Sequence, residues 1–167
     1  MEFKEIKLTE IEANPFKMIG QGWMLITAGD EDGYNMMTAS WGGLGVMWGK
    51  NVATVVVRPQ RHTLSFLDNS EHFTLSFYGE EYRDALKYCG AHSGKDVNKT
   101  EQTGLEPVFI DGTTTFEQAD TTLICKKLYR QELRADCFID KGLLTNYPLQ
   151  DYHVVFTGEI IKTITKK

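Results

Sequence analysis

The chain of 167 residues is 41% hydrophobic and 25% charged, which is typical of a soluble globular protein and unlike a disordered or fibrous one. Its formal net charge of -5 disfavours nucleic-acid binding, which requires clustered Lys and Arg, and its longest apolar runs are far too short to span a bilayer. We therefore expect one domain over residues 1–167, with neither nucleic acid nor membrane as a partner.

The first predicted element is a β-hairpin. Residues 23–29 (WMLITAG) form its first strand, 30–33 (DEDG) its turn and 34–41 (YNMMTASW) its second strand. A strand over Asn51–Arg58 follows. A short helix is predicted to start near Thr63, with Thr63 as its N-cap, and residues 71–78 return to the alternation of a strand.

The second half begins with a predicted helix over about residues 80–88. Its spacing places Tyr82, Ala85, Leu86 and Cys89 on one buried stripe. Residues 90–104 are predicted to be a loop with at most one helical turn, and 105–110 a strand. The last strands are predicted at 115–128, long enough to bend, and at 152–165, where Gly158 marks a bulge.

Strands thus outnumber helices. Because no βαβ rhythm and no GxGxxG motif occur, a Rossmann or flavodoxin-like sheet is disfavoured, and an antiparallel barrel with helical insertions fits better. Three widely spaced cysteines, Cys89, Cys125 and Cys137, are expected to be reduced structural thiols. The N-terminal segment lacks the apolar core of a secretory signal, so a cytoplasmic location is expected.

Two segments have the chemistry of an anion site. Residues 58–63 (RPQRHT) bring two arginines, a histidine and a hydroxyl to a helix start, where phosphate oxygens are well bound. Residues 93–99 (SGKDVNK) offer a small loop with two lysines. The alternatives are an ordinary solvated turn and an ordinary polar loop.

A third segment, residues 35–41 (NMMTASW), combines small residues, an aromatic wall and side-chain donors, as a flat heteroaromatic ligand requires. Its alternative is plain core or interface packing. Other chemistries lack support, because the four histidines show no metal-ligand spacing and neither a GxSxG nor a Walker motif occurs.

With these three segments and the terminal DYHVVFTGEI in this order, the chain resembles the flavin reductase-like FMN-binding split-barrel family, particularly its flavoredoxin-type branch. The resemblance implies a mainly β fold, an antiparallel Greek-key split barrel with a few short helices. It also implies a homodimer that holds FMN non-covalently near the subunit interface.

The resemblance assigns the site residues by position. The isoalloxazine and ribityl chain would be lined by Asn35, Met37, Thr38, Ala39, Ser40 and Trp41. The phosphate would be surrounded by Arg58, Arg61, His62 and Thr63, and the ribityl phosphate end would be covered by Ser93, Gly94 and Lys99. Tyr152 and His153 would approach the ring.

The implied function is that of an FMN-binding oxidoreductase, either an NAD(P)H-dependent flavin reductase or a flavoredoxin-like electron transfer protein. NADH or NADPH would supply hydride, and an unidentified acceptor would take the electrons. No catalytic acid/base group is expected, since the cofactor performs the chemistry. The alternatives are a non-enzymatic FMN electron carrier and a barrel that binds another phosphorylated ligand.

Overall fold

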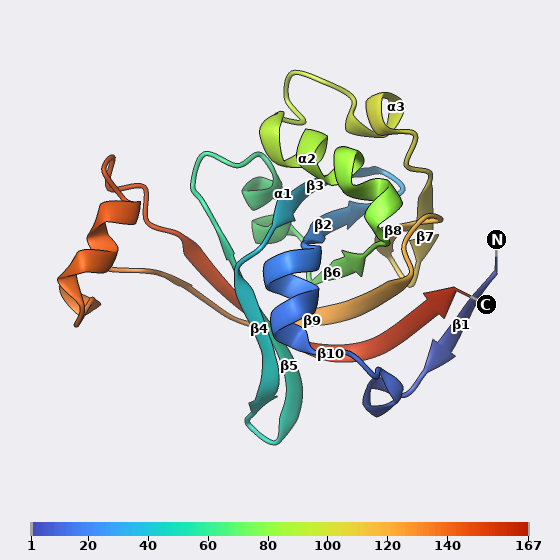
Figure 1. The fold of residues 1–167 in the computed structure, drawn as a ribbon, viewed down its shortest axis with the longest axis horizontal. Coiled ribbons are helices and arrows are strands. Elements are labelled where there is room, and N and C mark those ends of the chain that lie inside the picture. The colour runs from blue at the N-terminus through green and yellow to red at the C-terminus, as the bar shows by residue number, and fades with distance from the viewer. Residues whose placement is uncertain (1, 167) are drawn as a thin grey trace.

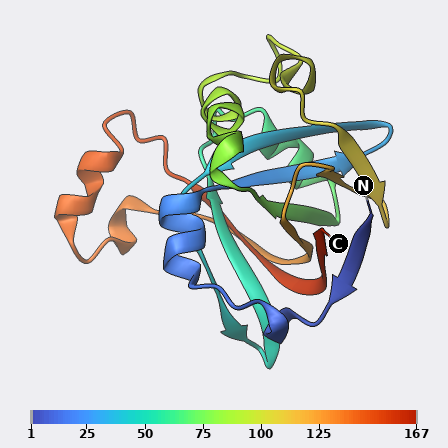
Figure 2. The ribbon, with the colours of Figure 1, turned by 45° about the vertical axis from the view of Figure 1, so that its right-hand side comes forward.

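The computed structural model describes residues 2–166 and builds them around one antiparallel sheet. In this range eight strands form one sheet (Figures 1 and 2). Seven of them are hydrogen-bonded in the order β3-β2-β6-β9-β10-β5-β4, and the eighth, β1, pairs with β10. Their bounds are β1 (Phe3–Ile6), β2 (Met24–Asp30), β3 (Gly33–Ala39), β4 (Gly42–Met47), β5 (Lys50–Val57), β6 (His72–Phe77), β9 (Thr121–Glu132) and β10 (Val154–Lys166). A separate hairpin joins β7 (Pro107–Ile110) to β8 (Thr113–Phe116).

The two ends of this sheet lie close together. β3 and β4 stand at opposite ends of the strand order, yet only Ser40 and Trp41 separate them in the chain. The sheet must therefore curl until its ends meet, and the ladder stays open between β3 and β4. We call this opening the seam. A curled antiparallel sheet with an open seam is a split barrel, so the predicted fold class is confirmed.

The barrel encloses the main hydrophobic core. Its buried side chains come from six strands, from helix α1 (Thr63–Asn69) and from Ile19 before β2, and include Ile26, Val55, Phe73 and Phe156. Each fully buried side chain of this size stabilises the fold by about 1.5–3 kcal/mol relative to an exposed one. The barrel wall is therefore a rigid support for whatever its seam holds.

A second core lies under helix α2 (Arg83–Ala91), which follows the short helix η3 (Glu80–Tyr82). Leu86 and Cys89 are buried, and Tyr82 and Ala85 pack against the same cluster, so the predicted helical stripe is confirmed. The predicted turn in the following loop is α3 (Lys99–Thr103). No helix within the described range is long and apolar enough to cross a membrane.

Several predicted elements are confirmed. The first hairpin forms with Asp30 paired to Gly33, and β5, β6, β7 and β10 lie where strands were predicted. The register shifts between Thr157 and Gly158, so the predicted bulge is confirmed as well. The prediction of one domain over residues 1–167 stays a prediction, and Met1 and Lys167 lie outside the described residues.

Two predictions are wrong. Thr63 is not the N-cap of α1, because His62 occupies that position and the Thr63 hydroxyl bonds to the Asn35 side chain instead. The single strand predicted over 115–128 is two strands, since β8 ends at Phe116 and β9 begins at Thr121. The backbone turns between them so that the Asp120 N–H reaches the Phe77 carbonyl.

Other elements had no sequence prediction, namely β1, β4, the short helices η1 (Leu8–Glu10) and η2 (Lys17–Gly22), and the segment between β9 and β10. That segment, residues 133–153, contains the helices η4 (Ala135–Cys137) and η5 (Lys141–Asn146). It extends away from the barrel at the left of Figure 1, coloured orange. We call residues 133–153 the arm.

Candidate functional site

The seam contains a cavity of about 320 Å³, which we call the seam cavity. The β3–β4 connection supplies one wall and the ends of β5 and β10 the opposite one. The lining residues are Met37, Thr38, Ala39, Ser40, Trp41, Val56, Arg58, Arg61 and His153. The cavity therefore joins the segment predicted to hold a flat ring to the RPQRHT segment.

A smaller cavity of about 140 Å³, which we call the helix cavity, lies between the start of α1 and the end of α2. It shares Arg61 with the seam cavity. Its lining residues are Gln60, Arg61, His62, Thr63, Gly90, Ala91, His92, Ser93, Gly94 and Lys99. Residues from the two predicted anion segments thus meet in one place, although about thirty positions separate them in sequence.

Asn35 is connected to the helix cavity through Thr63, which lines that cavity. Its side-chain amide donates a 2.8 Å hydrogen bond to the Thr63 hydroxyl oxygen. A Cβ on Gly94 would lie 2.0 Å from the Asn35 Oδ1, so a larger residue at position 94 would displace the Asn35 amide. Asn35 lines a third cavity of about 540 Å³, which shares Gly94 and Lys99 with the helix cavity.

Arg61 and Lys99 bring positive charge to the helix cavity by binding the C-terminal carbonyls of α2. Arg61 donates to the Gly90 and Cys89 oxygens at 2.7 and 3.2 Å, and Lys99 donates to the Cys89 and Met36 oxygens at 3.0 and 2.7 Å. A helix C-terminus is the electronegative end, so these contacts are favourable in themselves. Each cationic group keeps N–H donors beyond these bonds.

Burial weakens the charged form of both groups. Desolvation lowers the pKa of Arg61, and it lowers the pKa of Lys99 to about 8. Lys99 is only 4% exposed, so its ammonium is held out of bulk water. A bound anion would restore the electrostatic stabilisation that both cations lose on burial.

His62 has a buried ring nitrogen, Nδ1, without a hydrogen-bond partner among residues 2–166. Burial lowers the pKa of this imidazole, as do the nearby charges of Lys95 and Lys99. Its ring lies edge-on to Phe66 at 5.2 Å between centroids. Buried polar atoms are normally paired, so this nitrogen is a local cost to the fold; with almost no accessible surface it is not itself a contact for a ligand.

Arg58 lies elsewhere than the sequence reading placed it. It lines the seam cavity and not the helix cavity, because the Asp151 carboxylate attracts its guanidinium at 2.5 Å and the Asn146 carbonyl accepts a second bond at 2.8 Å. Hydrogen bonds from Gln60 and Arg58 lower the pKa of Asp151. Arg58 therefore fastens the base of the arm to the end of β5.

His153 lies at the back of the seam cavity and is 7% exposed. Its Nδ1 is 2.9 Å from the Tyr147 hydroxyl, and its ring lies 5.3 Å from that of Trp41. Burial lowers the pKa of His153, and Arg58 lowers it further against the opposing effect of Asp151. Tyr152, which was grouped with His153, lines neither cavity and packs against Phe138 and Tyr147.

Sequence reasoning missed Tyr147 and gave Asp151 no role. Asp151 opens the DYHVVFTGEI segment and had a local signal, namely a carboxylate beside a strand end that faces arginines. Tyr147 had none, because its contact with His153 depends on how the arm folds back over the end of β5.

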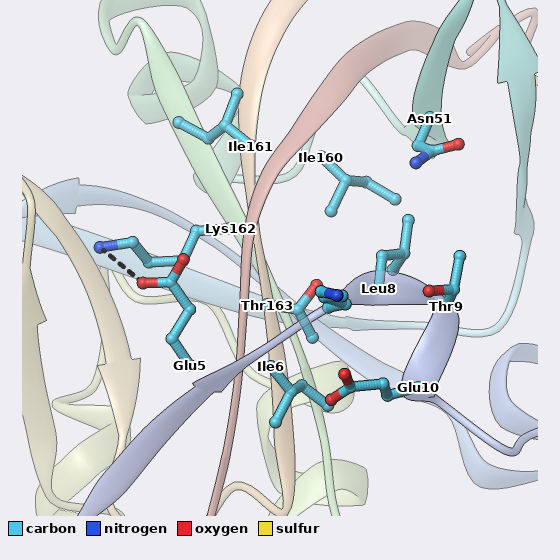
Figure 3. Close-up of a pocket in the computed structure, with 11 residues that line it drawn as sticks. Glu5, Ile6, Leu8, Thr9, Glu10, Asn51, Ile160, Ile161, Lys162 and Thr163 are labelled. Carbon is cyan, nitrogen blue, oxygen red and sulfur yellow. Dashed lines mark ion pairs between the residues drawn. The ribbon is translucent and has the colours of Figure 1, made fainter.

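A larger cavity of about 700 Å³ lies outside this region, where β10 passes from β5 to β1 (Figure 3). Its wall includes Ile160 and Ile161, and Lys162 there forms ion pairs with Glu5 and Asp111. None of the predicted site residues lines it. The largest cavity and the predicted site residues therefore lie in different parts of the fold.

A family model described as a flavin reductase like domain matches residues 16–167, which include the whole of the seam and helix cavities. The chain belongs to the flavin reductase-like family. No match was found among curated proteins.

Solved structures of this family share the fold at low sequence identity. A flavoredoxin of Desulfovibrio vulgaris (Miyazaki F) is 20% identical with a TM-score of 0.69, covering 98% of this chain and 78% of the other. An FMN-binding domain of a flavin reductase-like enzyme from Shewanella baltica is 18% identical with the same TM-score, covering 98% and 77%. The Streptomyces globisporus NADH:FAD oxidoreductase SgcE6, solved with NAD and FAD fragments, is 18% identical with a TM-score of 0.65, covering 87% and 74%.

Proposed function

We propose that this flavin reductase-like protein binds one FMN non-covalently, with the ring in the seam cavity and the phosphate in the helix cavity. The observation that carries the proposal is the junction of the two cavities at Arg61. One side of the junction is lined by Trp41 and small side chains, and the other contains the buried ammonium of Lys99 and the partly buried guanidinium of Arg61. A flavin mononucleotide has this same division into a flat ring and a dianionic end.

The donor set fits a phosphate. The guanidinium of Arg61 and the ammonium of Lys99 each keep N–H groups beyond their two carbonyl bonds. Thr63 accepts its hydrogen bond from Asn35, so its own O–H remains free to donate. Charge-assisted bonds of this kind are about twice as strong as neutral ones.

The residues of the seam cavity would orient the ring. Small side chains at Ala39 and Ser40 permit close approach of the backbone, and Trp41 supplies an aromatic wall that is half exposed. When bound, FMN supplies hydride and electron transfer between NADH or NADPH and a second acceptor. The protein contributes position, hydrogen-bond donors and partial exclusion of water.

We also infer that two copies associate through the arm. Ile139 is 99% exposed and Leu149 is 82% exposed, although both side chains are large and apolar. Large apolar side chains this exposed on a projecting segment favour a protein partner. The family resemblance favours a second copy of this chain as that partner.

The first test is the absorption spectrum and FMN affinity of the purified protein, followed by anaerobic addition of NADH and of NADPH. We expect a yellow protein whose flavin band bleaches with a nicotinamide. Bound FMN that stays oxidised with both donors would identify a carrier that is reduced by a protein partner. A protein that takes up no FMN would contradict the proposal.

The placement of the phosphate is tested with Arg61→Gln. Loss of a charge-assisted bond of about 1.5–3 kcal/mol should weaken FMN binding roughly 10- to 100-fold and leave riboflavin binding nearly unchanged. The matched control is Arg83→Gln, because Arg83 also donates to backbone carbonyls, those of Gln21 and Gly22, but lies outside both cavities. Equal losses for FMN and riboflavin would place the phosphate elsewhere.

A further inference from the structure

The hydrogen bond between Tyr147 and His153 has only one satisfactory direction. Tyr147 is 7% exposed, and within residues 2–166 its hydroxyl contacts no polar group other than the His153 Nδ1. If Nδ1–H donated to the hydroxyl oxygen, the phenolic O–H would be left without an acceptor. Donation by Tyr147 satisfies both atoms, so Nδ1 is the acceptor.

This direction fixes where the ring proton of His153 lies. In a neutral imidazole one nitrogen accepts and the other carries hydrogen, so an accepting Nδ1 leaves the proton on Nε2. At pH 7 the neutral form predominates, because burial and the Arg58 guanidinium lower the pKa of His153 below its ordinary value against the opposing effect of Asp151. His153 therefore has one N–H free of bonds within the described chain, and the residue lines the seam cavity.

The base of the arm holds Tyr147 in place. The Arg58 guanidinium lies 5.1 Å from the centre of the Tyr147 ring, and Phe138 and Tyr152 pack against that ring at 5.7 and 5.0 Å. Arg58 is itself fixed by the Asp151 carboxylate. The phenol thus has little freedom to leave His153.

From these contacts we propose that Tyr147 is a positioning residue, which locks His153 so that its Nε2–H donates a neutral hydrogen bond to the ring in the seam cavity. The inference rests on the proposed function. Reduction adds electron density to a flavin ring, and a preoriented donor in a cavity of low dielectric constant stabilises that charge. The pair would therefore favour the reduced over the oxidised cofactor without transferring a proton.

The apoprotein gives the first readout. Two-dimensional 15N–1H NMR of the imidazoles in the unaltered protein should show His153 neutral, with Nε2 protonated and Nδ1 an acceptor. Tyr147→Phe should change this pattern to a mixture of tautomers. The control is Tyr88→Phe, which removes a phenol stacked on His92 while keeping the contact of His92 Nδ1 with the Tyr88 backbone oxygen.

The midpoint potential of bound FMN gives the second readout. Tyr147→Phe should reduce the preference for reduced FMN about tenfold, which is about 30 mV toward negative potential for a two-electron couple. His153→Leu should do the same. In the Tyr147→Phe background, His153→Gln should restore the potential, since its amide N–H takes the place of Nε2–H; loss of packing alone would not be restored.

The failures are distinguishable. If the unaltered protein takes up no FMN, the proposed function is overturned, and the NMR measurement still decides the direction of the Tyr147–His153 bond. If FMN binds and the potentials of Tyr147→Phe and Tyr88→Phe equal that of the unaltered protein, the donor role is overturned. An unaltered protein with Nδ1 protonated overturns it too.

Discussion

At the scale of single residues, Lys99 makes the proposed phosphate site sensitive to pH. Its pKa is lowered to about 8 by burial, so the ammonium is charged at pH 7 and loses its proton as the pH rises through 8. The phosphate monoester has a second pKa of about 6 and stays dianionic over this range. FMN affinity should therefore be constant near pH 7 and fall between pH 8 and 9.5.

Two further measurements show whether the pH dependence of FMN affinity comes from Lys99 or from another titrating group. Lys99→Arg keeps a charged group at all these pH values, so its FMN affinity should not fall. Riboflavin affinity should not depend on pH in this range in either protein. Because a bound phosphate raises the pKa of Lys99, FMN binding near pH 8.5 should also take up protons, measurable by titration calorimetry in buffers of different ionisation enthalpy. An FMN affinity that is flat to pH 9.5 would contradict a contact with Lys99.

At the scale of elements, the bulge in β10 depends on a glycine. A Cβ on Gly158 would lie 2.7 Å from the Phe73 ring, which is fully buried and cannot move aside freely. Gly158→Ala should destabilise the fold by about 1–3 kcal/mol, observed as a lower urea midpoint. Gly45→Ala on the edge strand β4 is the control, because nothing lies within 4 Å of its added Cβ. Equal midpoints for both variants would show that the bulge can repack.

Elements with a local signal were predictable from the sequence. The first hairpin, the α2 stripe and the Gly158 bulge depend on alternation, helical spacing or a single glycine. β4 was not, because its sequence GGLGVM has little β propensity and pairing with β5 alone holds it in the sheet. The cap assigned to Thr63 failed for the same kind of reason, since its hydroxyl has a partner 28 residues away.

The candidate site, like the fold, was predictable only where the signal is local in the sequence. Its three segments were predictable, because helix starts, arginines and small residues indicate anion and ring binding wherever they lie in the fold. The different contacts of Arg58 and Arg61 were not predictable. Arg58 binds the Asp151 carboxylate and Arg61 binds a carbonyl at the end of α2, and both contacts involve partners distant in sequence.

At the scale of the whole molecule, the arm is the feature that predicts assembly. Ile139→Asp combined with Leu149→Asp places charges on its exposed apolar side chains and should convert a dimer to monomers, as measured by sedimentation equilibrium. Ile161→Asp is the control, since this half-exposed residue lines the cavity of Figure 3 and is not part of the arm. A monomeric unaltered protein, or a dimeric double variant, would contradict this role of the arm.

The arm leaves the barrel after Glu132 and returns to it at Val154, and these two residues pair with each other. The pairing of β9 with β10 therefore does not depend on the conformation of the arm. Ile139 is exposed on its outer part, and Leu149 is exposed at its base, between Tyr147 and Asp151 and close in sequence to His153. A force on the outer part would thus reach the wall of the seam cavity through one continuous segment. If two copies associate through the arm and bind FMN as proposed, dilution should separate them and loosen the arm, and the flavin should then become harder to reduce.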